Sequence, residues 1–93
     1  MERIEIEVFS QTTNAAVVRM PTRRFPGMVI QGDSLHILYR LADSIAKTAA
    51  SSANAEFGSD AEQLKDFLAR YVSSYEDVLK SHGMELPYAG DRL

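Results

Sequence analysis

The stretch Gly32-Asp33-Ser34-Leu35 offers a serine hydroxyl that could act as a nucleophile. Such a serine needs a general base within hydrogen-bond reach and a further group that orients the base. His36 is badly placed for this role, because two residues along a helix it points about 200° away from Ser34. His82 would have to be brought back by the fold. The spacing of these residues therefore leaves a catalytic site incomplete.

These four residues resemble the nucleophile block of the GDSL family of esterases and lipases, in which the serine follows a strand and opens a helix. That family consists of larger doubly wound α/β proteins with a late Asp-x-x-His pair and a Gly-x-Asn block, and neither pattern occurs in this sequence. The nearest pair, Asp77 and His82, has the wrong spacing. We therefore expect a protein that is not an enzyme, and keep a small Ser34-dependent ester hydrolase as an alternative.

A structural interpretation explains the same stretch more completely. Gly32 permits a sharp turn after a strand that ends near Gln31, and Asp33 or Ser34 caps a helix by accepting hydrogen bonds from free N–H groups. Asp33 also complements the positive end of the helix dipole. The stretch thus predicts the start of a helix.

Three arginines bracket a proline-rich connection just before this helix start, and guanidinium groups there would suit a carboxylate or a phosphate. The alternative is a solvated basic loop that pairs with acidic groups of the second half. Loops held by a scaffold often carry function. We therefore predict a contact surface for a protein partner or an anionic ligand, made of Arg19, Arg23, Arg24, Phe25, Gln31, Gly32, Asp33 and Ser34.

Tyr71 and Tyr75 lie within the apolar stripe of a predicted helix, and Ile37 falls off the apolar face of another. Ordinary core packing explains the tyrosines if each hydroxyl reaches a partner. Tyrosine is also favoured at protein interfaces. We keep all three residues as candidate interface positions.

Metal and cofactor sites are not expected. The sequence has two histidines without H-x-x-x-H or H-E-x-x-H spacing, no cysteine and no calcium-loop pattern. The basic cluster is small and lacks an aromatic stacking platform, so nucleic acid is not an expected partner.

The elements that would position these residues are three strands and two helices. Period-two alternation predicts a strand over residues 3–9, a second strand covers 15–20 after a turn at 10–14, and a short apolar run predicts a third over 28–31. Its place in the sheet is left open.

Helical spacing predicts a helix over residues 34–50, with Leu38, Leu41 and Ile45 on its apolar face and His36 on its polar face. A capping box at Ser59 to Glu62 predicts a second helix over 60–82, which Gly83 ends. A tail over 84–93 follows, in which Leu86 to Tyr88 could dock.

These elements predict one α+β domain spanning residues 1–93, in the order β-β-β-α-α. An antiparallel sheet of two or three strands would carry a two-helix hairpin packed on one of its faces, because this two-layer arrangement buries every apolar stripe. A chain of 93 residues buries a modest core, so a homodimer is also an expectation.

The composition bears on where in the cell the protein is located. No run of about 18 apolar residues exists, and the N-terminal residues alternate charge with aliphatics, which argues against a membrane span and a signal peptide. The absence of cysteine suits a cytoplasmic location. The net charge is −3, and the acidic excess lies in the second half.

Two stretches resemble a family of small bacterial proteins classed as a domain of unknown function. They are Asn14 to Met20 and Arg24 to Leu35, and the most specific part is Phe25-Pro26-Gly27-x-x-Ile30-Gln31-Gly32-Asp33-Ser34-Leu35. The resemblance extends to the second helix and Leu86-Pro87-Tyr88. It implies a bacterial intracellular protein and supplies no activity, substrate or catalytic residue.

The sequence as a whole favours a binding or interaction module that is not an enzyme. An antidote-like protein that masks a basic partner is a further alternative, because the acidic second half would accelerate docking to such a partner.

Overall fold

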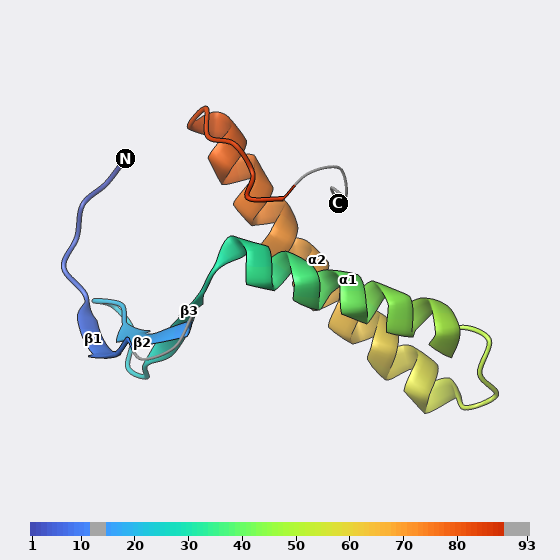
Figure 1. Ribbon diagram of the computed structural model, residues 1–93. Helices are drawn as coiled ribbons and strands as arrows, with labels where there is room; N and C mark the ends of the chain where they lie inside the picture. Colours follow the sequence, from blue (N-terminus) through green and yellow to red (C-terminus); the bar gives the residue numbers. More distant parts are fainter. Residues whose placement is uncertain (12–14, 89–93) are drawn as a thin grey trace. The chain divides into compact units, whose positions relative to one another are not determined.

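The computed structural model describes residues 1–11 and 15–88, which form two compact units (Figure 1). Met1–Gln31 is the first unit and contains three strands, and Gly32–Leu93 is the second unit and contains two helices. The α+β class and the predicted order β-β-β-α-α are confirmed. The packing of the helices on one face of the sheet stays a prediction.

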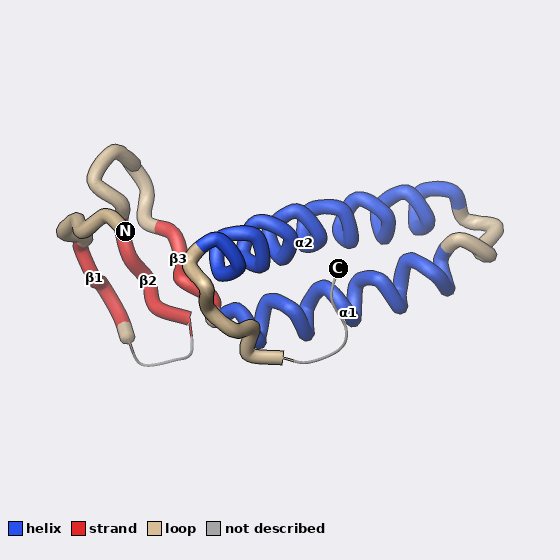
Figure 2. The backbone as a smooth tube through the Cα atoms, turned by 90° about the horizontal axis from the view of Figure 1, so that it is seen from above, coloured by secondary structure: helices blue, strands red, loops and turns tan. Residues whose placement is uncertain are grey.

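The first unit is an antiparallel meander of β1 (Glu7–Ser10), β2 (Ala15–Arg19) and β3 (Gly27–Ile30), in the order β1-β2-β3 (Figure 2). The third strand, whose place the sequence left open, pairs with β2 from Ala15 opposite Ile30 to Val18 opposite Gly27. β2 is central, and its Val18 is the buried apolar residue of the sheet, with 6% of its surface exposed.

β1 begins at Glu7, four residues later than the alternating pattern predicts. Glu7 already pairs with Arg19, the last residue of β2, so residues 3–6 extend past the end of their partner strand. A strand without a neighbour forms no ladder of hydrogen bonds, which ends the regular structure there. Of the predicted turn at 10–14, residues 12–14 lie outside the described residues.

The second unit is an antiparallel hairpin of α1 (Gly32–Ala49) and α2 (Ala55–Ser81) (Figure 2). Its seam is narrow because the buried residues between the helices are mostly alanines. A Cβ built on Gly58 would lie 3.4 Å from the carbonyl oxygen of Ala49, so the backbones also approach closely near the loop. The buried apolar residues of the hairpin are Ala42, Ala46, Ala49, Ala61 and Val72.

α2 begins five residues earlier than predicted, and its cap is Asn54. The Asn54 side chain accepts a hydrogen bond of 3.1 Å from the backbone N–H of Phe57, which satisfies one of the free donors of the first turn. The predicted capping box at Ser59 to Glu62 is therefore wrong, because these residues already lie inside the helix.

The end of α2 follows the prediction. Gly83 has φ +67°, a left-handed conformation that glycine adopts without a steric penalty. The N–H of Gly83 donates to the carbonyl of Lys80, and the N–H of Met84 donates to that of Leu79, at 3.1 and 2.9 Å. This pair of bonds is a Schellman motif, and it turns the chain back along the hairpin.

Candidate functional site

The most exposed apolar surface of the second unit lies beside the hairpin seam. The apolar stripe of each helix is wider than the part that the neighbouring helix covers. In α2, Leu68, Val72 and Leu79 are buried or half-buried, whereas other apolar residues of the same stripe are exposed. Besides Ile37, eight large apolar side chains of the two helices are each 43–59% exposed. We call this set the hairpin face: Leu38, Leu41, Ile45, Phe57, Leu64, Phe67, Tyr71 and Val78.

Helix geometry places both halves of the hairpin face on the same side of the hairpin. In α1, Leu41 and Ile45 each precede a buried seam residue, Ala42 and Ala46. In α2, Tyr71 precedes the buried Val72 in the same way. One residue corresponds to a rotation of 100° about the helix axis. Because the two helices run antiparallel, the same backward rotation from the seam leads to the same side.

The opposite side of the hairpin carries the docked tail. Tyr88 stacks on His36 with ring centroids 3.7 Å apart and an angle of 8° between the ring planes, and its hydroxyl donates a 2.8 Å hydrogen bond to Glu76. The docking of the tail is thus confirmed. His36 lies on the side of α1 away from the apolar face, as predicted, yet it is only 4% exposed because the ring of Tyr88 covers it.

Two ion pairs also lie away from the hairpin face. Lys47 contacts Asp43 at 2.9 Å, as the i,i+4 spacing predicts, and Lys65 contacts Glu62 at 2.8 Å. The hydrogen bond to Asp43 raises the pKa of Lys47 above its usual value, and the hydrogen bond to Glu62 raises the pKa of Lys65 likewise. These charges keep the side opposite the hairpin face hydrated.

Gly32 has a packing role that the sequence did not reveal. A Cβ built on Gly32 would overlap the far end of the Tyr75 ring, so this ring packs on the start of α1. Tyr75, a candidate interface residue, is therefore part of the hairpin seam. The other two candidates, Ile37 and Tyr71, are 58% and 59% exposed.

Asp33 and Ser34 lie in the first turn of α1, which begins two residues earlier than predicted. The carboxylate of Asp33 accepts a 2.8 Å hydrogen bond from the backbone N–H of Ser34, one of the free donors at the helix start. His82, the second candidate base, has its Nδ1 2.9 Å from the carbonyl oxygen of Val78. Its contact is with its own helix end.

The arginines of the predicted contact surface belong to the first unit. Arg19 donates two hydrogen bonds, of 2.9 and 2.8 Å, to the carboxylate of Glu7, its partner across the β1–β2 pair. An anion at Arg19 would have to displace this carboxylate. The guanidinium of Arg24 lies 5.2 Å from the centre of the Phe25 ring, a cation–π arrangement.

A depression in the first unit brings together part of the predicted surface. Arg23 and Phe25 line it with apolar residues of β2, β3 and the connection between them. Arg19, Arg24 and Gln31 are not among its lining residues. It offers apolar walls and one guanidinium, a combination that suits a small apolar group with a carboxylate. The lining residues are Val18, Met20, Arg23, Phe25, Gly27, Met28 and Val29.

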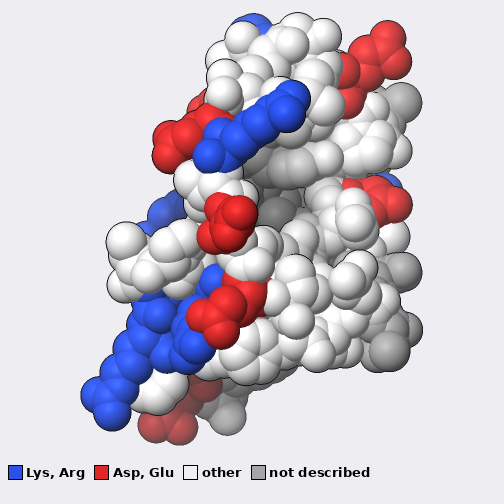
Figure 3. All heavy atoms as spheres, turned by 90° about the vertical axis from the view of Figure 1, so that its left-hand side faces the viewer, with Lys and Arg blue, Asp and Glu red and all other residues white. Residues whose placement is uncertain are grey.

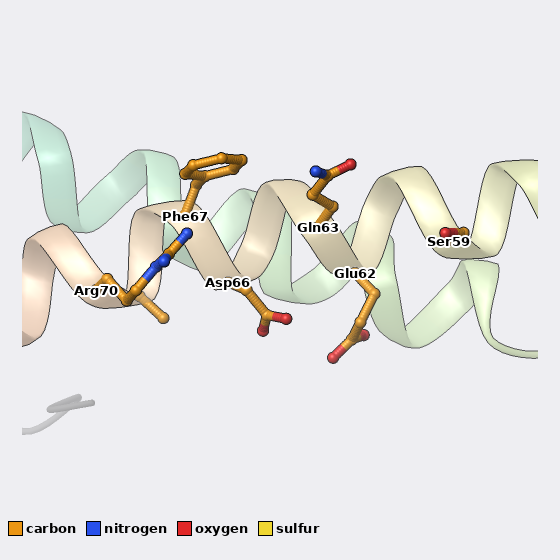
Figure 4. A pocket seen from close by; sticks show the side chains of 7 residues that line it. Ser59, Glu62, Gln63, Asp66, Phe67 and Arg70 are labelled. Atoms are coloured by element: carbon orange, nitrogen blue, oxygen red, sulfur yellow. The ribbon is translucent and has the colours of Figure 1, made fainter.

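A second depression runs along α2 (Figure 4). All its lining residues come from this one helix, so it is a shallow groove between neighbouring side chains and not a cavity between elements. The guanidinium of Arg70 lies 4.8 Å from the centre of the Phe67 ring and flanks the hairpin face. The lining residues are Ser59, Glu62, Gln63, Asp66, Phe67, Ala69 and Arg70.

Metal sites and membrane-spanning helices are two further features that would bear on function. Within residues 1–11 and 15–88, no three His, Cys, Asp or Glu side chains gather where they could hold a metal ion. None of the helices described is both long and apolar enough to span a bilayer. On the face drawn in Figure 3, basic side chains lie beside acidic ones, so the charge there is mixed.

The fold and these surfaces define a small α+β protein with a three-stranded meander and a helical hairpin. Residues 1–88 match the model of a family described as a family of unknown function, DUF6959, and the chain belongs to this family. The predicted resemblance is therefore confirmed. No curated protein and no solved structure matches the chain.

Proposed function

We propose that this protein is a protein–protein interaction module and that the hairpin face is its contact surface. The observation that carries the proposal is the exposure of the eight apolar side chains of the hairpin face, each close to half of its surface. Scattered exposed apolar residues are normal, but these residues lie on one side of two packed helices. Continuous apolar patches larger than about 300–600 Å² are rare on monomeric proteins and mark interaction sites.

The composition of the hairpin face supports a protein partner. It contains two phenylalanines and a tyrosine, and aromatic residues are enriched where proteins bind one another. Tyr71 and Phe67 lie one helical turn apart near the middle of α2. We expect this aromatic pair to contribute most to binding.

The depression lined by Arg23 and Phe25 is a second proposed contact surface, for an acidic or anionic group of a partner. Replacing Arg23 and Arg24 together by alanine would then weaken the interaction and reduce its dependence on salt. Unchanged binding and an unchanged salt dependence would remove this surface from the proposal. We place the module in the bacterial cytoplasm, which suits a chain without cysteine.

Photo-crosslinking in the source cells tests the proposal. Benzoylphenylalanine is introduced in place of Tyr71, which is exposed on the hairpin face, and separately in place of Asp66, which is exposed and points away from Phe67 (Figure 4). We expect discrete protein adducts from position 71 and few from position 66. Adding Leu64→Glu to the position 71 variant should remove these adducts. Equal adduct patterns from both positions would contradict an interaction through the hairpin face.

A further inference from the structure

We propose that the hairpin face binds the hairpin face of a second copy of this chain, so that four helices enclose a common apolar core. This inference deepens the proposed function and rests on it. It identifies the partner of the interaction module as a second copy of the same chain.

The spacing of the exposed residues indicates a helical partner. Phe57, Leu64, Tyr71 and Val78 recur at intervals of seven along α2, and Phe67 lies between two of them. In α1, Leu38, Leu41 and Ile45 follow at intervals of three and four. Heptad spacing of this kind is the pattern by which one helix packs its side chains into another.

The seam between α1 and α2 uses the same spacing. Ala61, Leu68 and Val72 of α2 are buried or half-buried, at intervals of seven and four. Each helix therefore carries two heptad stripes side by side, and its own hairpin partner covers only one of them. A helix with two such stripes is typical of a bundle with more than two helices.

The length of the hairpin face favours a second hairpin over the strands of the same chain. From Phe57 to Val78 the face extends about 32 Å, at 1.5 Å per residue. The strands have four or five residues and so reach about 17 Å at most. Neighbouring strands are about 4.8 Å apart, so a three-stranded sheet measured across its strands is also no longer than the strands themselves. A second hairpin has the full length of the face.

The area of the hairpin face meets the requirement of a stable dimer. Aromatic side chains carry about 150–250 Å² each and the smaller aliphatic ones lie near or below the lower end of that range, so eight that are half-exposed present about 700 Å². A standard stable interface buries about 800 Å² on each partner. Close contact of the two faces therefore accounts for most of the area that a specific dimer needs.

The hairpin face itself carries no charge, and the charges that flank it along α2, Asp60 and Arg70, have opposite signs. The ion pairs Asp43–Lys47 and Glu62–Lys65 lie on the other side of the hairpin. The hairpin also has little core of its own, because Ala46, Ala49 and Ala61 form its buried cluster. A second copy is present whenever the chain is made, and closed two-fold dimers are the commonest assemblies.

Sedimentation velocity on the purified full chain measures the oligomeric state over a wide range of concentrations. We expect a species of twice the chain mass of 10.4 kDa. Leu41→Glu and Leu64→Glu each place a charge in the face and should weaken the dimer about 100-fold or more. Asp66→Lys changes the charge of an exposed side chain that points away from Phe67 (Figure 4), and should leave the dimer intact. Circular dichroism identifies any variant that fails to fold.

An experiment on the unaltered chain keeps the inference testable if these variants unfold. Labelled and unlabelled chains are mixed, and nuclear Overhauser contacts between different copies are recorded. Contacts between the methyl groups of Leu41 or Leu64 in one copy and the same face in the other would support the inference. A dimer whose contacts lie elsewhere, or one that persists in both folded glutamate variants, would overturn it.

A monomeric full chain would also overturn the inference, and the crosslinking result then decides about the proposed function. Adducts between position 71 and a different protein would keep the interaction module with another partner. If no adducts form and the face methyl groups contact strand residues of the same chain, both the inference and the proposed function fail.

Discussion

At the scale of single residues, several positions have roles that their local sequence does not reveal. Gly32 looks like a turn glycine next to Asp33 and Ser34, yet the reason for its small size is the ring of Tyr75. His36 falls on the polar side of a helical wheel, yet Tyr88, 52 residues further on, covers it. In both cases the decisive contact comes from a distant residue, which no local pattern contains.

The contact between Gly32 and Tyr75 leads to a prediction. Gly32→Ala should lower the free energy of unfolding by about 1–3 kcal/mol, because the added methyl group overlaps a packed ring. Gly27→Ala is the matched control, since a Cβ at Gly27 meets no atom within 4 Å, and its effect should stay within about 1 kcal/mol. Urea unfolding followed by circular dichroism measures both. Equal effects of the two substitutions would contradict the packing role of Gly32.

The pair of Lys47 and Asp43 gives a prediction about pH. Its hydrogen bond raises the pKa of Lys47 above 10.5 in the folded chain, so the pair stabilises the fold fully below that pH. The stabilisation is lost as the pH rises through the raised pKa. Asp43→Asn should bring the pKa of Lys47 down, and NMR titration of the lysine side chain measures this change. A pKa that does not fall would show that Asp43 is not its cause.

At the scale of elements, the periodicity of apolar residues predicts both helices, because an amphipathic helix carries its pattern within itself. The same periodicity does not show which part of a wide stripe a neighbour covers. Leu64 and Leu68 belong to one pattern, yet Leu68 is half-buried and Leu64 is half-exposed. The sequence signal for the hairpin face is that the apolar stripe of α2 is wider than one neighbouring helix can cover. Apolar residues recur at intervals of seven along both edges of this stripe.

The start of α2 is an example of two competing signals. Ser59 to Glu62 matches a capping box, but Asn54 lies earlier and the four residues between Asn54 and Ser59 are already helical. A good N-cap forms where the chain enters the helix, so a later match has no free N–H groups to satisfy.

Two substitutions distinguish these alternatives. Asn54→Ala should lower the free energy of unfolding by about 1 kcal/mol, because it removes the acceptor of the Phe57 N–H. Ser59→Ala should leave stability unchanged or raise it slightly, since alanine is favoured within a helix. Thermal unfolding of both variants provides the measurement. A larger loss for Ser59→Ala would restore the capping box as the helix start.

At the scale of the whole molecule, the sequence predicts the class and order of elements, since each element has a local signature. The arrangement of strands and helices depends on contacts between distant segments, and alternation alone did not decide the place of β3. The division into two compact units likewise has no signature in the chain, because the first unit ends at Gln31 and the second begins at Gly32, with no linker sequence between them.

The division into units yields the last prediction. The seam, the hairpin face and the docked Tyr88 all belong to the second unit, so a chain of residues 32–93 should retain the helical circular dichroism signal of the full chain. It should also associate to the same degree. Sedimentation and circular dichroism on this shorter chain check both expectations. Loss of the helical signal would show that the hairpin requires the strands.

The contact of Tyr88 with His36 has a practical meaning for anyone who handles this protein. Tyr88 lies on the side opposite the hairpin face, so a fluorescent reporter or a surface linker attached at its exposed neighbour Pro87 starts away from the proposed binding surface. Immobilisation through this position should therefore present the apolar helices to a partner in solution without obstruction.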